Sequence, residues 1–227
     1  MSNTTMTYKD YLDQAQSEIS ALNPNGYYET YKKYEFGYWQ YIPNWIFRYC
    51  QNNNVKNTLD VGVAYGTLAL FTKLISSCDL YGVDFVKYIS DDLVKKYDIK
   101  YQINNIEIEQ FPWDIKFDVI LFTEIMEHLN YNILPTLLKI KSLLSKNGKI
   151  FLSTPDAFFW GKCNEYKNWQ DMPDISKIIE IKDQHIYQFG ETELLEIFKT
   201  VGLKFDKIMW ADGFNGMKHF NIQLSKG

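Results

Sequence analysis

The sequence predicts an α/β fold, in which an N-terminal helical cap precedes a doubly wound, mostly parallel sheet of seven strands. Beyond residue 54, short runs of strand-forming residues alternate with amphipathic segments, a pattern typical of a parallel sheet covered by helices. The last two strand candidates are joined only by residues 211–218, which is too short for a crossover helix. The last strand is therefore expected to be antiparallel. A chain of 227 residues is long enough to bury a full core.

Residues 1–54 are expected to form the cap, which is rich in aromatic residues. Five of them recur at spacings of three and four: Tyr31, Tyr34, Tyr38, Tyr41 and Trp45. This spacing predicts one face of a helix. The simpler interpretation is a helix packed on the sheet. The alternative is a lid over a ligand at residues 35–39, where Gly37 would let the backbone turn.

The second predicted domain runs from residue 55 to residue 227, after a polar break. Its strands are expected at 58–63, 80–84, 100–104, 117–122, 149–153, 204–210 and 220–224. Its helices are expected at 67–77, 86–95, 125–145 and 191–201, with Pro135 interrupting the third or starting a new helix. The irregular segment 155–185 follows a strand end, where loops shape substrate sites, and we interpret it as a substrate-side insertion.

The net charge of −4 and the pI near 5.5 argue against a general nucleic-acid surface, although a small basic patch is compatible with them. The cysteines Cys50, Cys78 and Cys163 have no paired spacing, which predicts neither a disulfide framework nor a zinc ribbon. The N-terminus lacks an apolar signal core, and no apolar run approaches membrane-spanning length. We therefore expect a cytoplasmic protein without membrane contact.

A glycine-containing turn follows the first predicted strand and opens a helix. Residues 59–66 read Leu-Asp-Val-Gly-Val-Ala-Tyr-Gly, and their small residues would let the backbone approach a ligand. The spacing differs from the G-x-G-x-x-G fingerprint of dinucleotide sites. Asp84 ends the next strand, where its carboxylate could accept hydrogen bonds from two ribose hydroxyls.

A second cluster of polar residues follows the fourth predicted strand. That strand ends in Thr123 and Glu124, and Glu127 and His128 come next. If a helix starts here, positions i, i+3 and i+4 share one face, so two carboxylates and an imidazole could converge on a divalent metal. The alternative is an ordinary polar first turn, in which the helix dipole favours glutamate.

Together these segments resemble the class I S-adenosylmethionine-dependent methyltransferases, which implies a Rossmann-like fold. The matching segments are 59–66, 81–84, 117–129, 143–155 and 189–203, in the order of the family. The resemblance implies a cofactor site that consists of Asp60, Gly62, Ala64, Gly66, Asp84, Phe85, Asn105, Ile106 and Thr123. Asp60 would lie near the methionine amino end, Asp84 at the ribose and Asn105 at the adenine. Ala64 departs from the usual glycine, and Asn105 stands where an acidic residue is common.

The Glu-x-x-Glu-His segment resembles two metal-dependent groups, the 2′-O-methyltransferases of small-RNA 3′ ends and the ubiquinone-pathway O-methyltransferases. In the RNA group a further histidine before a helix completes the site, and His185 fits that local pattern. The resemblance therefore implies a site for a divalent metal, Mg²⁺ or Mn²⁺, held by Glu124, Glu127, His128 and His185. A hydrogen-bonded loop histidine is the alternative for His185, and His219 is expected to be structural.

We expect metal-assisted O-methylation of a hydroxyl that has an adjacent oxygen. The acceptor would be a small sugar, a polyol or a phenol, or an RNA 3′ end, which the net acidity disfavours. One alternative is a metal-independent small-molecule N- or O-methyltransferase, with Glu124 and His128 as base and orienting group. Another is a domain that binds cofactor or partner without catalysis, against which the intact set of Asp60, glycines and Asp84 argues.

Overall fold

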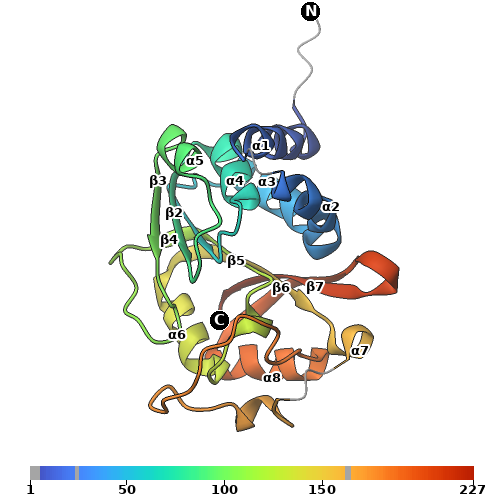
Figure 1. Cartoon of the computed structure of the whole chain (residues 1–227). Helices are drawn as coiled ribbons and strands as arrows, with labels where there is room; N and C mark the ends of the chain where they lie inside the picture. The colour runs from blue at the N-terminus through green and yellow to red at the C-terminus, as the bar shows by residue number, and fades with distance from the viewer. Residues whose placement is uncertain (1–5, 24–25, 162–164) are drawn as a thin grey trace, which may run out of the picture.

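A computed structural model describes residues 6–23, 26–161 and 165–227, and in it a central sheet lies between two layers of helices (Figure 1). The strands are β1 (Asn57–Val61), β2 (Asp79–Asp84), β3 (Ile99–Ile103), β4 (Phe117–Thr123), β5 (Leu144–Pro155), β6 (Leu203–Asp212) and β7 (Lys218–Lys226). Their order is β3-β2-β1-β4-β5-β7-β6. The neighbouring pairs are parallel except those of β7, which runs antiparallel to both β5 and β6. The predicted sheet is thus confirmed.

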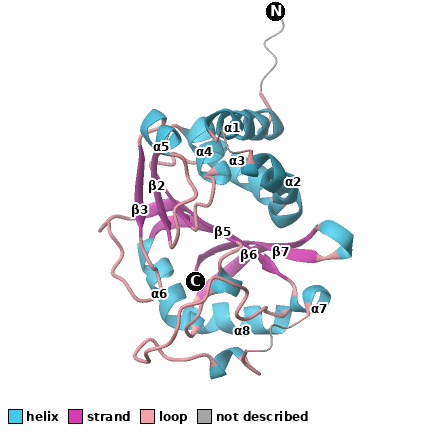
Figure 2. Cartoon of the chain, viewed as in Figure 1, coloured by secondary structure: helices cyan, strands magenta, loops and turns pink. Residues whose placement is uncertain are grey.

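The helices divide between the two faces of the sheet (Figure 2). One layer contains α1 (Tyr8–Leu22), α2 (Tyr27–Trp39), α3 (Ile42–Asn52), α4 (Thr67–Ser76) and α5 (Asp91–Lys96). The opposite layer contains α6 (Ile133–Leu143) and α8 (Glu191–Val201), with the short α7 (Ala157–Trp160) near it. Three 3₁₀ helices are η1 (Met126–His128), η2 (Trp169–Asp171) and η3 (Phe214–Gly216).

Two hydrophobic clusters, one on each face, enclose the central strands. In β4, Ile120 and Phe122 belong to one cluster, whereas Val119 and Leu121 belong to the other. Alternate side chains of a strand point to opposite faces, so a strand that is apolar throughout is buried on both sides. This burial fixes the register of β4 and hence the place where its polar end emerges.

The amino-terminal helices are part of this packing. Ala15 and Ile19 of α1 belong to the same cluster as Leu70 and Phe71 of α4. The aromatic segment is helical, but the single helix face predicted over Tyr31 to Trp45 is divided between α2 and α3, and Gly37 lies within α2 without turning the chain. A Cβ at Gly37 would lie 2.9 Å from the Cα of Gly213, so the glycine allows α2 to approach the β6–β7 connection closely.

The junction between α2 and α3 is held by the last strand. Asn221 of β7 donates a hydrogen bond from Nδ2 to the carbonyl oxygen of Tyr38, at 2.8 Å. Its Oδ1 accepts one from the backbone N–H of Tyr41, at 3.0 Å. Asn221 is fully buried, so this one side chain of β7 satisfies both the carbonyl oxygen of Tyr38 and the N–H of Tyr41.

Two predicted helices have different bounds in the structure. The expected helix at 125–145 is instead η1, an irregular link and then α6, which begins because the side chain of Asn132 caps it at the N–H of Leu134. Pro135 lies in the first turn of α6, where its missing N–H costs nothing. The expected helix at 86–95 starts only at α5, because Ser90 caps it by accepting from the N–H of Leu93.

Some predictions concern residues that the structure does not describe. Residues 1–5 and 24–25 of the predicted cap lie outside the described part of the chain, as do residues 162–164 of the predicted insertion, which include Cys163. Within the described residues, none of the helices combines the length and the apolar character that crossing a membrane requires.

Candidate functional site

A cavity of about 330 Å³ opens at the carboxyl ends of β1, β2 and β4. Its lining includes seven of the nine predicted cofactor residues, which are Gly62, Ala64, Asp84, Phe85, Asn105, Ile106 and Thr123. The other two, Asp60 and Gly66, line a smaller cavity of about 30 Å³, which shares Gly62, Ala64 and Thr123 with the first. The fold therefore brings all nine together. The larger volume lies within the range of small-molecule sites, roughly 300–1,000 Å³.

The turn after β1 adopts the left-handed conformations that its small residues allow. Gly62, Ala64 and Gly66 have φ angles of 77°, 47° and 87°. A side chain at Gly62 would overlap that of Ile125, so the position requires glycine both for its backbone and for space. Ala64 holds the same kind of backbone with a Cβ, at a cost of about 1–2 kcal/mol.

Asp84 fixes this turn from the neighbouring strand. Its Oδ2 accepts a hydrogen bond from the N–H of Ala64 at 2.8 Å, and its Oδ1 accepts one from the N–H of Val86 at 3.3 Å. Burial raises the pKa of Asp84, and the backbone donors oppose that shift. Since each carboxylate oxygen accepts about two hydrogen bonds, Asp84 can still bind ligand hydroxyls.

The predicted helical face that would carry Glu124, Glu127 and His128 does not form, and this prediction was wrong. Glu124 is left-handed, with φ 55°, and η1 starts only at Met126. Glu124 therefore shares no helix face with Glu127 and His128, although its charge is close enough to raise the pKa of Glu127. Its Oε2 lies 2.9 Å from Nδ1 of His219, at ion-pair distance without hydrogen-bond geometry.

Glu127, His128 and His185 nevertheless meet at one point. Each offers one potential ligand atom, and these atoms lie within 4.8 Å of one another. Oε2 of the fully buried Glu127 accepts a hydrogen bond from Oγ1 of Thr154 at 2.9 Å. Three buried atoms of the site have no hydrogen-bond partner among the described residues, namely Oε1 of Glu124, Oε1 of Glu127 and Nδ1 of His128. Because such atoms cost about 1–3 kcal/mol each, a bound cation would fit this donor set.

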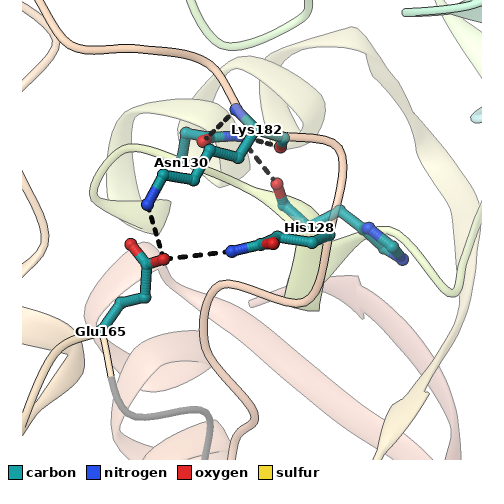
Figure 3. Close-up of polar contacts among 5 residues, drawn as sticks. His128, Asn130, Glu165 and Lys182 are labelled. Atoms are coloured by element: carbon teal, nitrogen blue, oxygen red, sulfur yellow. Dashed lines mark hydrogen bonds and ion pairs between the residues drawn. The ribbon is translucent and has the colours of Figure 1, made fainter.

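The segment that carries His185 is pinned to the turn after β4 (Figure 3). Asn130 donates from Nδ2 to the carbonyl oxygens of His128, at 3.0 Å, and Lys182, at 3.1 Å, and accepts from the N–H of Lys182 at 2.9 Å. The carbonyl oxygen of Glu127 also accepts from the N–H of Ile186 at 2.6 Å. Backbone contacts therefore set the spacing between the two histidines, whose ring centroids are 4.8 Å apart.

The protonation states of this group follow from burial. Burial raises the pKa of Glu127 well above its usual value, and the charge of Glu124 adds to the shift. Burial lowers the pKa of His128, and burial together with His128 lowers the pKa of His185. The two imidazoles are thus neutral near pH 7, and neutral imidazole is the form that ligates metals.

Two further residues lie near the site, namely His219 and Glu35, the second of which the sequence placed only in the alternative of a lid at residues 35–39. His219 was expected to be structural, yet its ring lies beside Glu124 and 5.2 Å from the ring of Trp160. The signal was the antiparallel strand itself: β7 begins at the edge where parallel strands end, and His219 pairs with Pro155 in the register. Glu35 has no such signal, because its position depends on how α2 packs.

A sequence family described as a methyltransferase domain matches residues 31–208, which is more than half of the chain. No curated protein matches the sequence.

Several solved structures have a similar fold. The 1,6-didemethyltoxoflavin-N1-methyltransferase of Burkholderia thailandensis, with bound S-adenosylhomocysteine, is 13% identical with a TM-score of 0.60, over 100% of this chain and 93% of that one. The magnesium protoporphyrin IX methyltransferase of Synechocystis is 12% identical with a TM-score of 0.61, over 94% of both chains. The O-methyltransferase from a trans-AT PKS multienzyme of Brevibacillus brevis is 15% identical with a TM-score of 0.62, over 92% and 78%. At these identities the likeness concerns the fold.

Proposed function

This chain belongs to the methyltransferase domain family and is a class I S-adenosylmethionine-dependent methyltransferase, and we propose that it methylates a hydroxyl oxygen that has an adjacent oxygen, with the help of a divalent metal. The observation that carries the proposal is the meeting of Glu127, His128 and His185 beside the large cavity, with buried atoms that lack partners. His128 and Glu124 line that cavity, so the group borders the space where a cofactor would lie.

S-adenosylmethionine supplies an electrophilic methyl group on a sulfonium. The nine predicted cofactor residues, all of which line one of the two cavities, would bind it. Asp84 would contact the ribose hydroxyls, and Asn105 and Ile106 would contact the adenine. The left-handed turn at Gly62 allows the backbone to approach the ligand closely. Leu129 and Ile125 add apolar walls that exclude water from the reacting atoms.

A divalent metal, Mg²⁺ or Mn²⁺, would supply a Lewis acid that lowers the pKa of an acceptor hydroxyl. Glu127, His128 and His185 would hold it, and Glu124 would complete the set of four. His219 would orient Glu124 through the 2.9 Å contact. Two carboxylates and two imidazoles form a mixed oxygen and nitrogen site, which suits several first-row metals as well as Mg²⁺.

We propose a small acceptor, namely a sugar, a polyol or a phenol. Lys182 is the one lysine among the residues that line the large cavity, and no arginine lines it. The ammonium of Lys182 is already paired with Glu165 at 2.6 Å. An RNA 3′ end is therefore a less favoured acceptor, because phosphate contacts need unpaired cations.

A second candidate function is metal-independent N- or O-methylation of a small molecule, with Glu124 as base and His128 as orienting group. The position of Glu124 favours it, since this carboxylate contacts His219 and is not among the three residues that meet at one point. The proteins of similar fold include N-methyltransferases as well as O-methyltransferases.

Metal analysis of the purified protein, combined with a screen of sugars, catechols and short RNAs with labelled cofactor, tests the proposal. We expect a bound divalent metal, loss of turnover on chelation and its return when metal is added back. Glu196→Gln is a matched control, because this carboxylate is exposed on α8 and lines neither cavity. Turnover that survives complete chelation, with Glu127→Gln and His185→Ala as active as the control, would leave the metal-independent reaction as the function.

A further inference from the structure

The small cavity beside the glycine turn is lined by three carboxylates from three different elements. Glu35 comes from α2, Asp60 from β1 and Glu124 from the turn after β4. The residues that line it include no lysine, arginine or histidine. Its volume of about 30 Å³ has room for only one or two groups of the size of a water molecule, each of which needs roughly 10–15 Å³. The cavity therefore suits a single small polar group with a positive charge.

The hydrogen bonds that Glu35 accepts from the described residues come from neutral donors, although the charge of Lys32 lowers its pKa. Its Oε1 accepts a hydrogen bond from Oγ1 of Thr67 at 2.6 Å, and its Oε2 accepts from Nε2 of Gln16 at 2.8 Å and from the hydroxyl of Tyr28 at 3.2 Å. A carboxylate has about four acceptor positions, so one position on Oε1 remains. Only 1% of Glu35 is exposed to solvent. A carboxylate that is buried in this way gains from a cationic partner.

Asp60 is a second buried carboxylate that a cationic partner would stabilise. It is buried, and burial together with the charge of Asp84 raises its pKa well above the usual value. Burial also raises the pKa of Glu35 to about 7. Both carboxylates line the same small space, where a bound cation would offset the cost of charging either of them.

S-adenosylmethionine carries such a cation, the α-ammonium group, at its amino-acid end. The large cavity would hold adenine at Asn105 and ribose at Asp84, so the amino-acid end of the cofactor extends toward the glycine turn, which both cavities share. An ammonium group carries one charge and three donors in a small volume. A hydrated Mg²⁺ keeps several waters, for which this cavity is too small.

We propose that Glu35 of the amino-terminal helices is a cofactor-binding residue, which together with Asp60 binds the α-ammonium group of S-adenosylmethionine. The inference rests on the proposed function and adds a residue that lies outside the strand-end segments. It makes α2 part of the cofactor site. Through Gln16 and Thr67, the same carboxylate joins α1 and α4 to the bound ligand.

The test is a comparison of two ligands by calorimetric titration. S-adenosylhomocysteine carries the ammonium group, whereas 5′-methylthioadenosine lacks the amino-acid end altogether. In Glu35→Gln we expect S-adenosylhomocysteine to bind about 10-fold or more weakly, because the negative charge opposite the ammonium group is lost, and methylthioadenosine to bind as in the wild type. Asp60→Asn should show the same selective loss. Glu29→Gln, on an exposed carboxylate of the same helix, should change neither affinity.

The outcomes separate the two levels of the proposal. Equal losses for both ligands in Glu35→Gln would show that Glu35 only supports the fold of the turn, and unchanged affinities would show that it has no role; either result overturns the inference. If the wild type binds neither ligand, the proposed function itself fails. Should Glu35→Gln not fold, Glu35→Asp gives the same comparison, because it keeps the charge but withdraws it by one methylene.

Discussion

Carboxylates gather in two places, around the small cavity and around η1, and the two places differ in the side chains that surround the carboxylates. Around the small cavity, Glu35 accepts hydrogen bonds from neutral hydroxyl and amide donors, and Asp60 and Glu124 line the same space. Around η1, Glu127 stands with two neutral imidazoles. Carboxylates alone in a small cavity favour an ammonium group, whereas carboxylates with imidazoles favour a metal. The partners of a buried carboxylate therefore indicate its ligand better than its burial does.

The largest effect is expected around η1. Glu127→Ala would remove a carboxylate of the proposed metal site, and we expect turnover to fall by about 100-fold or more, with loss of bound metal. The affinity for S-adenosylhomocysteine should stay within about 2-fold, because Glu127 does not line the large cavity. Parallel measurements of kcat, metal content and ligand affinity check this. A variant that loses cofactor affinity instead would show that the two places are not independent.

Gly62→Ala tests the wall that both cavities share. The new methyl group would overlap the side chain of Ile125 on a backbone with φ 77°, so we expect a loss of about 2–5 kcal/mol in the free energy of unfolding. Gly66→Ala is the matched control, because its Cβ would lie 3.2 Å from Ile89 and needs less movement. Denaturant titrations of both variants check the order, and equal losses would contradict the role of Ile125.

The pH dependence of the unfolding free energy tests the raised pKa of Glu35 at the small cavity. The pKa of Glu35 is raised from 4.5 to about 7 in the folded state, so between these values the folded protein holds a proton that the unfolded chain has released. Stability from this group therefore falls as the pH rises from about 4.5 to about 7. Relative to Glu35→Gln, the wild type should lose roughly 2–3 kcal/mol over this window. A constant difference between the two unfolding free energies across the window would contradict the raised pKa.

The smallest effect is expected at the one residue of the turn that departs from glycine. Ala64→Gly relieves a left-handed alanine, a gain that the greater freedom of glycine in the unfolded chain partly offsets. We expect a net stabilisation of up to about 1 kcal/mol and unchanged affinity for S-adenosylhomocysteine. Thermal unfolding with and without this ligand measures both, and a destabilised variant would show that the methyl group of Ala64 packs usefully.

The parts of the site that could be predicted lie at strand ends. Asp60, Asp84 and Thr123 belong to parallel strands, and the sheet geometry alone brings such residues to one edge. Glu124 could not be placed, because one left-handed residue redirects its side chain and no local pattern announces that turn. Glu35 could not be placed either, since its distance from Asp60 depends on the packing of α2 on α4, which is long-range in sequence.

His185 lies between these cases. Its local segment suggested a ligand, but its position depends on Asn130 and on the carbonyl oxygen of Glu127, more than fifty residues earlier in the chain. The spacing of residues along the sequence does not predict these hydrogen bonds. A sequence motif can therefore identify the candidate ligand, whereas the hydrogen bonds that position it can be found only in the structure.

The contact of Asn221 with Tyr38 and Tyr41 has a consequence for the order of folding. Helices α2 and α3 are synthesised before β7, yet the side chain that satisfies their junction belongs to that strand, about 180 residues later. Contacts across such a separation close late. We predict that pulse-labelled hydrogen exchange will find the N–H of Tyr41 protected only after the β5–β7 pair has formed; earlier protection would contradict this order. The junction of α2 and α3 is then fixed in place only after a much later part of the chain has joined the sheet.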